Sequence, residues 1–281
     1  MKKLLLFLLL VMLAGVTGCK QEKAVSDDVE EAISSFITNY ASDYLSDVEK
    51  LDFYFYVISA IKALDDSGYD VSLNDYLDAD SVYNYYQNYE YQTINEIFKA
   101  IIVCRAFGVG YEKAKEALEE ITDVDIYNYT YGLIALKITN VNKNLQDELS
   151  EKVLIIREED YRDPDYAGLA MMATSDEDVN RDSLFTLIDD AINDDGVVSW
   201  GNANSCSTAN VILGLMALDI DPTTYQDHNL IASLLKYYED GAFKYTLDGE
   251  VDLLFSTPQA FAALAMYKVF YETDKPVNLF L

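Results

Sequence analysis

Two stretches near the C-terminal end decide the fold: DGVVSWGNANSCSTANVILGLMALDIDP (195–222) and DGAFKYTLDGEVDLLFSTPQAFAALAMYKVF (240–270). Each begins with Asp-Gly, passes through an aromatic residue and a polar loop to Ser-Thr-x-Asn or Ser-Thr-x-Gln, and ends in an apolar segment rich in Ala and Leu. A helix that is apolar nearly all round is typical of a buried helix. The two stretches therefore predict consecutive copies of one unit, a polar loop followed by a buried helix.

The same apolar pattern recurs along the chain, which indicates a repeat architecture. The predicted buried helices lie within residues 56–64, 97–108, 129–138, 165–174, 211–220 and 260–270. Each contains a small residue that lets neighbouring helices approach closely: Ala60, Ala100, Gly132, Gly168, Gly214 and Ala263.

The segments between these buried helices have a different character. Ala114, Ala117, Leu118 and Ile121, for example, follow the i, i+3, i+4, i+7 spacing of an amphipathic surface helix. Strand patterning is weak, and the tyrosine-rich residues 83–92 are the one place where a short hairpin competes. Six alternations of outer and inner helix predict an all-α fold, an α6/α6 toroid of six helical hairpins with inner and outer rings.

The two opening stretches resemble consecutive repeats of the terpene cyclase and protein prenyltransferase superfamily. They are also similar to the α-domain of transcobalamin and intrinsic factor, and to related bacterial surface proteins. The resemblance covers about 75 C-terminal residues and implies the toroid fold. Because such repeats maintain the fold in binding proteins and enzymes alike, the resemblance leaves the activity open.

The N-terminal residues have the pattern of a secretory signal, with Lys2 and Lys3 followed by a short apolar run. Residues 16–19, Val-Thr-Gly-Cys, resemble the bacterial lipobox. We therefore predict a lipoprotein signal peptide at 1–18, a short linker at 19–25 that starts at the lipidated Cys19, and a toroid domain at 26–281. This arrangement predicts a protein held through its lipid on the extracytoplasmic face of a bacterial membrane. A plain secreted protein is the alternative.

The chain is strongly acidic, with 49 Asp and Glu residues against 20 Lys and Arg residues and a formal net charge of −29. Such a surface repels phosphate backbones and anionic lipids. We therefore predict no nucleic-acid partner, and membrane contact through the lipid anchor alone.

Catalytic and metal sites known in toroid proteins find poor matches here. Asn204-Ser205-Cys206 lies where prenyltransferases hold zinc with Asp-x-Cys, but the aspartate is replaced, and His228 is the chain's one histidine. Asp219-Ile220-Asp221-Pro222 lacks the last acid of the cyclase motif. Three Asp-x-Asp pairs offer oxygen atoms to calcium but lack the glycine and distal glutamate of an EF-hand loop: Asp78-Ala79-Asp80, Asp123-Val124-Asp125 and Asp163-Pro164-Asp165. We predict no metal, no cofactor and no catalytic residue, and separate free thiols at Cys104 and Cys206.

A carbohydrate-active enzyme remains an alternative, because two carboxylates suffice for a glycosidase. The candidates precede or begin inner helices: Asp163, Asp165, Asp195 and Asp252. Two such carboxylates facing each other would favour this enzyme, whereas an apolar mouth would favour ligand binding. A protein-interaction scaffold is a third hypothesis.

The longest connections lead into inner helices and are rich in aromatic and amide side chains. Aromatic bodies with polar tips in a concave site suit a small, partly apolar or sugar-like ligand. The predicted ligand-binding residues are Trp200, Asn202, Asn204, Ser207, Thr208, Tyr131, Tyr166, Phe243 and Tyr245. The alternative for Trp200, Phe243 and Tyr245 is packing of the loops onto the barrel. The sequence thus predicts non-catalytic binding of an unknown small molecule or glycan, with a corrinoid as one candidate.

Overall fold

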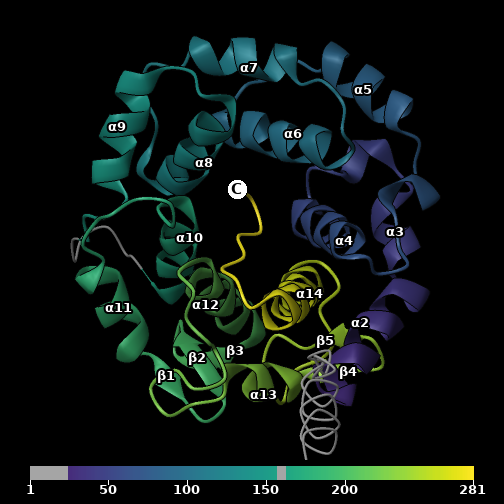
Figure 1. The fold of residues 1–281 in the computed structure, drawn as a ribbon, viewed down its shortest axis with the longest axis vertical. Helices are drawn as coiled ribbons and strands as arrows, with labels where there is room; N and C mark the ends of the chain where they lie inside the picture. The colour runs from purple at the N-terminus through teal and green to yellow at the C-terminus, as the bar shows by residue number, and fades with distance from the viewer. Residues whose placement is uncertain (1–24, 157–162) are drawn as a thin grey trace, which may run out of the picture.

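A computed structural model describes residues 25–156 and 163–281 (Figure 1). The predicted signal peptide at 1–18, Cys19 and nearly all of the linker lie outside the described residues. Helices make up most of the described chain and the strands are short, so the predicted all-α class is confirmed. Within the described ranges, no helix is both long and apolar enough to cross a bilayer.

The inner helices surround the centre of the molecule (Figure 1). They are α4 (Phe55–Ser67), α6 (Ile94–Ala106), α8 (Tyr129–Thr139), α10 (Pro164–Ala173), α12 (Ser205–Ala217) and α14 (Ser256–Thr273). Each inner helix contacts the next in this order, and α14 contacts α4. The first and last inner helices therefore lie side by side, and the inner helices form a closed ring.

The outer helices pack against the outside of this ring (Figure 1). They are α2 (Asp27–Asn39), α3 (Ala41–Leu45), α5 (Ala79–Asn88), α7 (Glu112–Glu119), α9 (Lys143–Lys152), α11 (Asp182–Asp189) and α13 (Leu230–Leu235). Short 3₁₀ helices precede some of the other helices: η1 (Val48–Lys50), η2 (Leu73–Asp75) and η3 (Ile126–Asn128). The tyrosine-rich stretch falls largely within α5, so helix rather than hairpin forms there.

Glycine allows the closest approach between inner helices, as the sequence predicts. A Cβ atom added to Gly214 would lie 2.8 Å from the Cα atom of Gly168, and one added to Gly168 would overlap the backbone carbonyl of Asn210. Backbone therefore packs directly on backbone where α10 crosses α12. The contact fixes the position of Asn210 relative to the start of α10.

Two small β-sheets stand where the sequence predicts polar loops. Strands β1 (Ile192–Asn193), β2 (Gly196–Ser199) and β3 (Asn202–Asn204) precede α12, and β4 (Tyr238–Glu239) pairs with β5 (Ala242–Phe243) before α14. Positive φ angles at Trp200-Gly201 and Asp240-Gly241 give the two-residue turns that join these antiparallel strands. The prediction of loops was wrong because Trp200-Gly201 and Asp240-Gly241 adopt the positive φ angles that close tight turns, so the flanking residues pair as strands.

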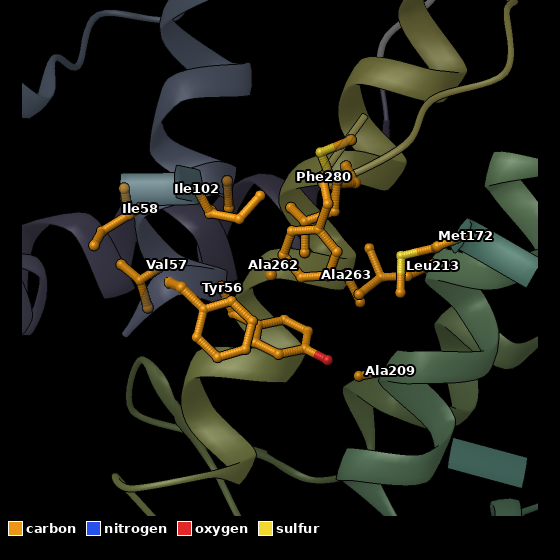
Figure 2. Close-up of a cluster of buried hydrophobic side chains, with 14 of the residues drawn as sticks. Tyr56, Val57, Ile58, Ile102, Met172, Ala209, Leu213, Ala262, Ala263 and Phe280 are labelled. Carbon is orange, nitrogen blue, oxygen red and sulfur yellow. The ribbon is translucent and has the colours of Figure 1, made fainter. Parts of the chain in front are cut away.

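The C-terminal segment turns back into the centre of the ring (Figure 1). Figure 2 shows Phe280 in a cluster with side chains of several inner helices, including Tyr56 and Ile102. The Phe280 ring lies 5.4 Å from that of Tyr56 and 5.6 Å from that of Phe98. Arg105 donates a hydrogen bond to the carbonyl of Phe280 at 2.6 Å. Residues 277–281, which we call the tail, therefore close one end of the ring centre.

Candidate functional site

A pocket of about 500 Å³ lies at the opposite end of the ring from the tail, where the inner helices begin. Its lining comes from the first turns of most inner helices and from the long loop before α14. The described lining residues are Tyr56, Tyr131, Asp165, Leu169, Cys206, Asn210, Tyr245, Asp252, Phe255 and Gln259. We call this cavity the mouth pocket.

A hydrogen-bonded network crosses the wall of the mouth pocket and is centred on Asn210. Its side-chain amide donates to Asp165 at 3.0 Å and to Gln259 at 3.2 Å. The hydroxyl of Tyr56 donates to the Asn210 carbonyl oxygen at 2.7 Å, and Ser207 donates to Asp165 at 2.7 Å. Side chains of α4, α10, α12 and α14 are thereby joined, and their polar atoms are held in fixed positions.

Asp165 is the charged member of this network. Burial raises the pKa of its carboxyl above the usual value, and the nearby Asp163 adds to the rise, while the hydrogen bonds from Asn210 and Ser207 oppose it. Burial, and secondarily the charge of Asp165, raise the pKa of Tyr131 to about 12. Burial likewise raises the pKa of Tyr56. Both phenols therefore stay protonated at neutral pH.

Cys206 points its thiol toward Ser256, with sulfur and oxygen 3.4 Å apart. Burial raises the pKa of this thiol to about 12, and Asp165 and Asp252 add to the rise. The thiolate needed for nucleophilic attack is therefore scarce at neutral pH. Cys104 is also free, so the predicted separate thiols are confirmed for these two residues.

Asp252 lines the pocket but serves as a cap for the start of α14. Its Oδ1 accepts from the backbone N–H groups of Leu254 and Phe255, and its Oδ2 accepts from both the N–H and the hydroxyl of Ser256. Partial burial opposes ionisation, but these hydrogen bonds outweigh it and lower the pKa of Asp252. Both oxygen atoms are thus engaged by the protein.

Three of the predicted ligand-binding residues belong to the mouth. Tyr131 and Tyr245 line the pocket, and the hydroxyl of Ser207 donates a hydrogen bond to Asp165, which also lines it. Tyr131 stacks on Phe98 with ring centroids 4.8 Å apart, which fixes its ring. Tyr245 remains 40% exposed.

The structure uses other predicted residues to hold the repeat unit together. Asn204 is buried and caps α12 by accepting from the backbone N–H of Ser207 at 2.8 Å. Thr208 accepts from the backbone N–H of Val197 at 3.0 Å, and Thr257 receives the same bond from Phe243 at 2.9 Å. These threonines fasten each hairpin to its helix.

The remaining predicted residues lie outside the pocket lining. The ring of Phe243 is buried beside that of Tyr238, and the hydroxyl of Tyr166 donates to the carbonyl of Val153. Trp200 and Asn202 are exposed at the turn between β2 and β3, with Trp200 77% exposed. The structure therefore separates these four from Tyr131 and Tyr245.

Several mouth residues were not predicted as ligand-binding, including Tyr56, Asn210, Gln259 and Phe255. Asn210 and Gln259 occupy the same position of the repeated Ser-Thr-x-Asn/Gln motif, and this equivalence was the signal available in the sequence. Tyr56 gave no comparable signal, because its partner Asn210 lies 154 residues away.

The acidic pairs considered for calcium contain helix caps. Asp78 accepts from Ser81, Asp125 from Tyr127, and Asp163 from Tyr166, each through a backbone N–H group. His228 lies 3.3 Å from the exposed Asp194. Within residues 25–156 and 163–281, no group of three or more His, Cys, Asp or Glu residues is arranged to hold a metal ion.

Exposed large hydrophobic side chains gather at the mouth end. Except for Tyr83 and Tyr271, those of the described chain lie in connections leading toward inner helices: Phe53, Tyr127, Ile155, Trp200, Tyr245, Leu247, Leu253, Leu254 and Phe255. Exposed apolar side chains are thus concentrated in the connections that lead into the inner helices.

In comparisons with known proteins, no protein-family model matches the chain and no curated protein is significantly similar to it. Function is therefore inferred from the chemistry of the mouth pocket and its rim.

Proposed function

We propose that this protein is an α6/α6 toroid that binds a small, partly apolar or sugar-like ligand in the mouth pocket without catalysing a reaction. We further propose that a lipid on Cys19 anchors it to the extracytoplasmic face of a bacterial membrane. The closed ring of inner helices, with outer helices packed around it, supports the toroid. The lipobox-like residues 16–19 support the anchor.

The Asn210 network is the observation that carries the binding proposal. It holds a carboxylate, two side-chain amides and a phenol in fixed positions on the wall of an open cavity. A few positioned polar groups among aromatic side chains are typical of small-molecule sites. Because the network is already assembled, little ordering free energy is lost when a ligand binds.

The carboxylate contacts favour binding over glycoside hydrolysis. Asp252 uses both oxygen atoms to cap α14, and Asp163 caps α10. Asp195 lies 3.0 Å from Lys236. Of the four candidate carboxylates, Asp165 and Asp252 line the pocket. Asp252 accepts four hydrogen bonds from residues 254–256, whereas Asp165 accepts one each from Ser207 and Asn210. This leaves Asp165 as the less engaged carboxylate, and a glycosidase needs two for its chemistry.

Phe280 limits the ligand to the mouth. Its buried ring and the tail fill the ring centre beneath Tyr56, so the proposed ligand occupies the pocket above that residue. A long apolar chain running through the centre would have to displace the tail.

A thermal-shift screen against corrinoids, isoprenoids, glycans and divalent metals tests the proposal. We expect at least one organic class to raise the melting temperature of the wild-type protein. Tyr245→Ala should reduce that rise, whereas Tyr83→Ala, at a residue 41% exposed on α5, should leave it unchanged. These two variants remove the same side chain at similar exposure.

Failure of every class to raise the melting temperature would reject corrinoids, isoprenoids, glycans and divalent metals as ligands and would favour the scaffold hypothesis. Release of a hydrolysed product from a glycan would instead favour the enzyme.

A further inference from the structure

The charged residues that line the mouth pocket are all acidic. Asp165 and Asp252 line it, and none of its described lining residues is basic. The chain as a whole carries a formal charge of −29. Anionic ligands are therefore repelled, both on approach and inside the pocket.

The described hydrogen-bond partners of the Asp165 carboxylate are all uncharged donors. Ser207 and Asn210 each donate one hydrogen bond, one to each carboxylate oxygen. A carboxylate has about four acceptor sites, so acceptor capacity remains. Partial burial without a described cationic partner disfavours the charged form. A cation placed in the pocket would stabilise it.

Aromatic rings form much of the remaining wall. Tyr56 and Tyr131 line the inner part, Tyr245 lies nearer solvent, and Phe255 is 58% exposed at the rim. Aromatic faces attract organic cations, and quaternary ammonium ions are commonly bound among such rings. Leu253 and Leu254, 46% and 50% exposed beside Phe255, extend the rim as an apolar surface.

We propose that the ligand is an organic ammonium ion with an apolar substituent, its cationic group beside Asp165 among Tyr56, Tyr131 and Tyr245 and its substituent against Phe255 and Leu254. This inference rests on the proposed binding function of the mouth pocket. A bare metal ion fits less well, because the oxygen atoms of Asp252 are already engaged and no group of three or more His, Cys, Asp or Glu residues in the described chain is arranged to hold one.

Isothermal titration of the full chain with matched probes tests this ligand class. Choline should bind at least about tenfold more tightly than 3,3-dimethylbutan-1-ol, its neutral analogue of the same shape. Benzyltrimethylammonium should bind at least about tenfold more tightly than tetramethylammonium, because the benzyl group contacts the rim.

Variants locate the cation. Asp165→Asn should weaken binding of benzyltrimethylammonium at least about tenfold. Asp195→Asn, which removes the same charge at a carboxylate outside the pocket, should leave the affinity unchanged. If Asp165→Asn fails to fold, Tyr245→Ala with Tyr83→Ala as its control tests the same site.

Equal affinity for choline and its neutral analogue, or an equal effect of the two aspartate variants, would overturn the ammonium assignment. A neutral compound that binds at Tyr245 in those experiments would retain the proposed function with a different ligand class. Absence of binding by every probe and every class in the thermal-shift screen would remove both proposals.

Discussion

The two ends of the ring centre differ in how they are filled. At the tail end, the chain supplies its own apolar occupant, and the Phe280 ring contacts those of Phe55, Tyr56 and Phe98. At the mouth end, polar side chains border an open cavity of about 500 Å³. Tyr56 contributes to both ends of the ring centre, because its ring contacts that of Phe280 and its hydroxyl donates a hydrogen bond to Asn210.

The difference indicates that the tail end contributes mainly to the stability of the fold, whereas the mouth end is available for ligand binding. The tail end buries apolar surface, which stabilises the fold. The mouth end keeps a carboxylate and amides at a cavity wall, an arrangement that contributes less to stability and remains available to a ligand. Substitutions at the two ends should therefore have different effects.

The largest expected effect is at the tail. Phe280→Ala should lower the free energy of unfolding by about 3–5 kcal/mol, because it leaves a cavity among aromatic rings at a residue that is 1% exposed. Phe255→Ala, the same change at the exposed mouth rim, should cost about 0.5 kcal/mol or less. Urea denaturation measures both, and equal costs would contradict the proposed division between the ends.

The next effect concerns the glycine contact behind the network. Gly168→Ala should cost about 1–3 kcal/mol, because the added methyl group overlaps the backbone carbonyl of Asn210. In Gly132→Ala the methyl group would meet the flexible ends of Ile94 and Leu149 at 3.0 and 3.1 Å, and higher helix propensity contributes about 1 kcal/mol in return. If Gly132→Ala lowered the free energy of unfolding more than Gly168→Ala, this account of the contact between α10 and α12 would be contradicted.

Asp252 should contribute a smaller, pH-dependent amount. Asp252→Ala removes the cap of α14 and should cost about 1 kcal/mol at neutral pH. Because folding lowers the pKa of Asp252, its stabilisation is present above the pKa of the unfolded chain and is lost as pH falls through the folded pKa. Denaturation at pH 7 and pH 3 should therefore show a larger cost at pH 7, and an equal cost at both would exclude the charged cap.

Asp165 should have the opposite pH dependence. Because folding raises its pKa, the unfolded chain ionises first, and the wild-type protein loses stability as pH rises from the unfolded pKa to the folded pKa. The stability of Asp165→Asn relative to wild type should therefore improve across that interval. A difference between the two proteins that stays constant with pH would show that Asp165 titrates as in the unfolded chain.

The helical framework was predictable from the sequence because it depends on local patterns. The apolar segments correspond to the inner helices, and Gly168 and Gly214 meet as small residues should. The hairpins were missed although Asp240-Gly241 is a turn signal. The interpretation of each repeat unit as a polar loop followed by a buried helix left no place for the hairpin turn within that loop.

The mouth pocket could be predicted only in outline. Tyr131 and Tyr245 line it, whereas Trp200, predicted from the same aromatic-rich connections, lies exposed on a turn. Tyr56 and Phe280 acquire their roles through contacts between distant parts of the chain. No local pattern indicates that residues 277–281 turn into the ring centre.

Hydrogen exchange with and without the compound that most raises the melting temperature tests the mouth assignment most directly. A ligand in the mouth pocket should slow exchange in residues 163–170 and 245–259 and leave residues 277–281 unchanged. Slower exchange in residues 277–281, with no change at the mouth, would contradict the assignment and place the ligand at the tail end.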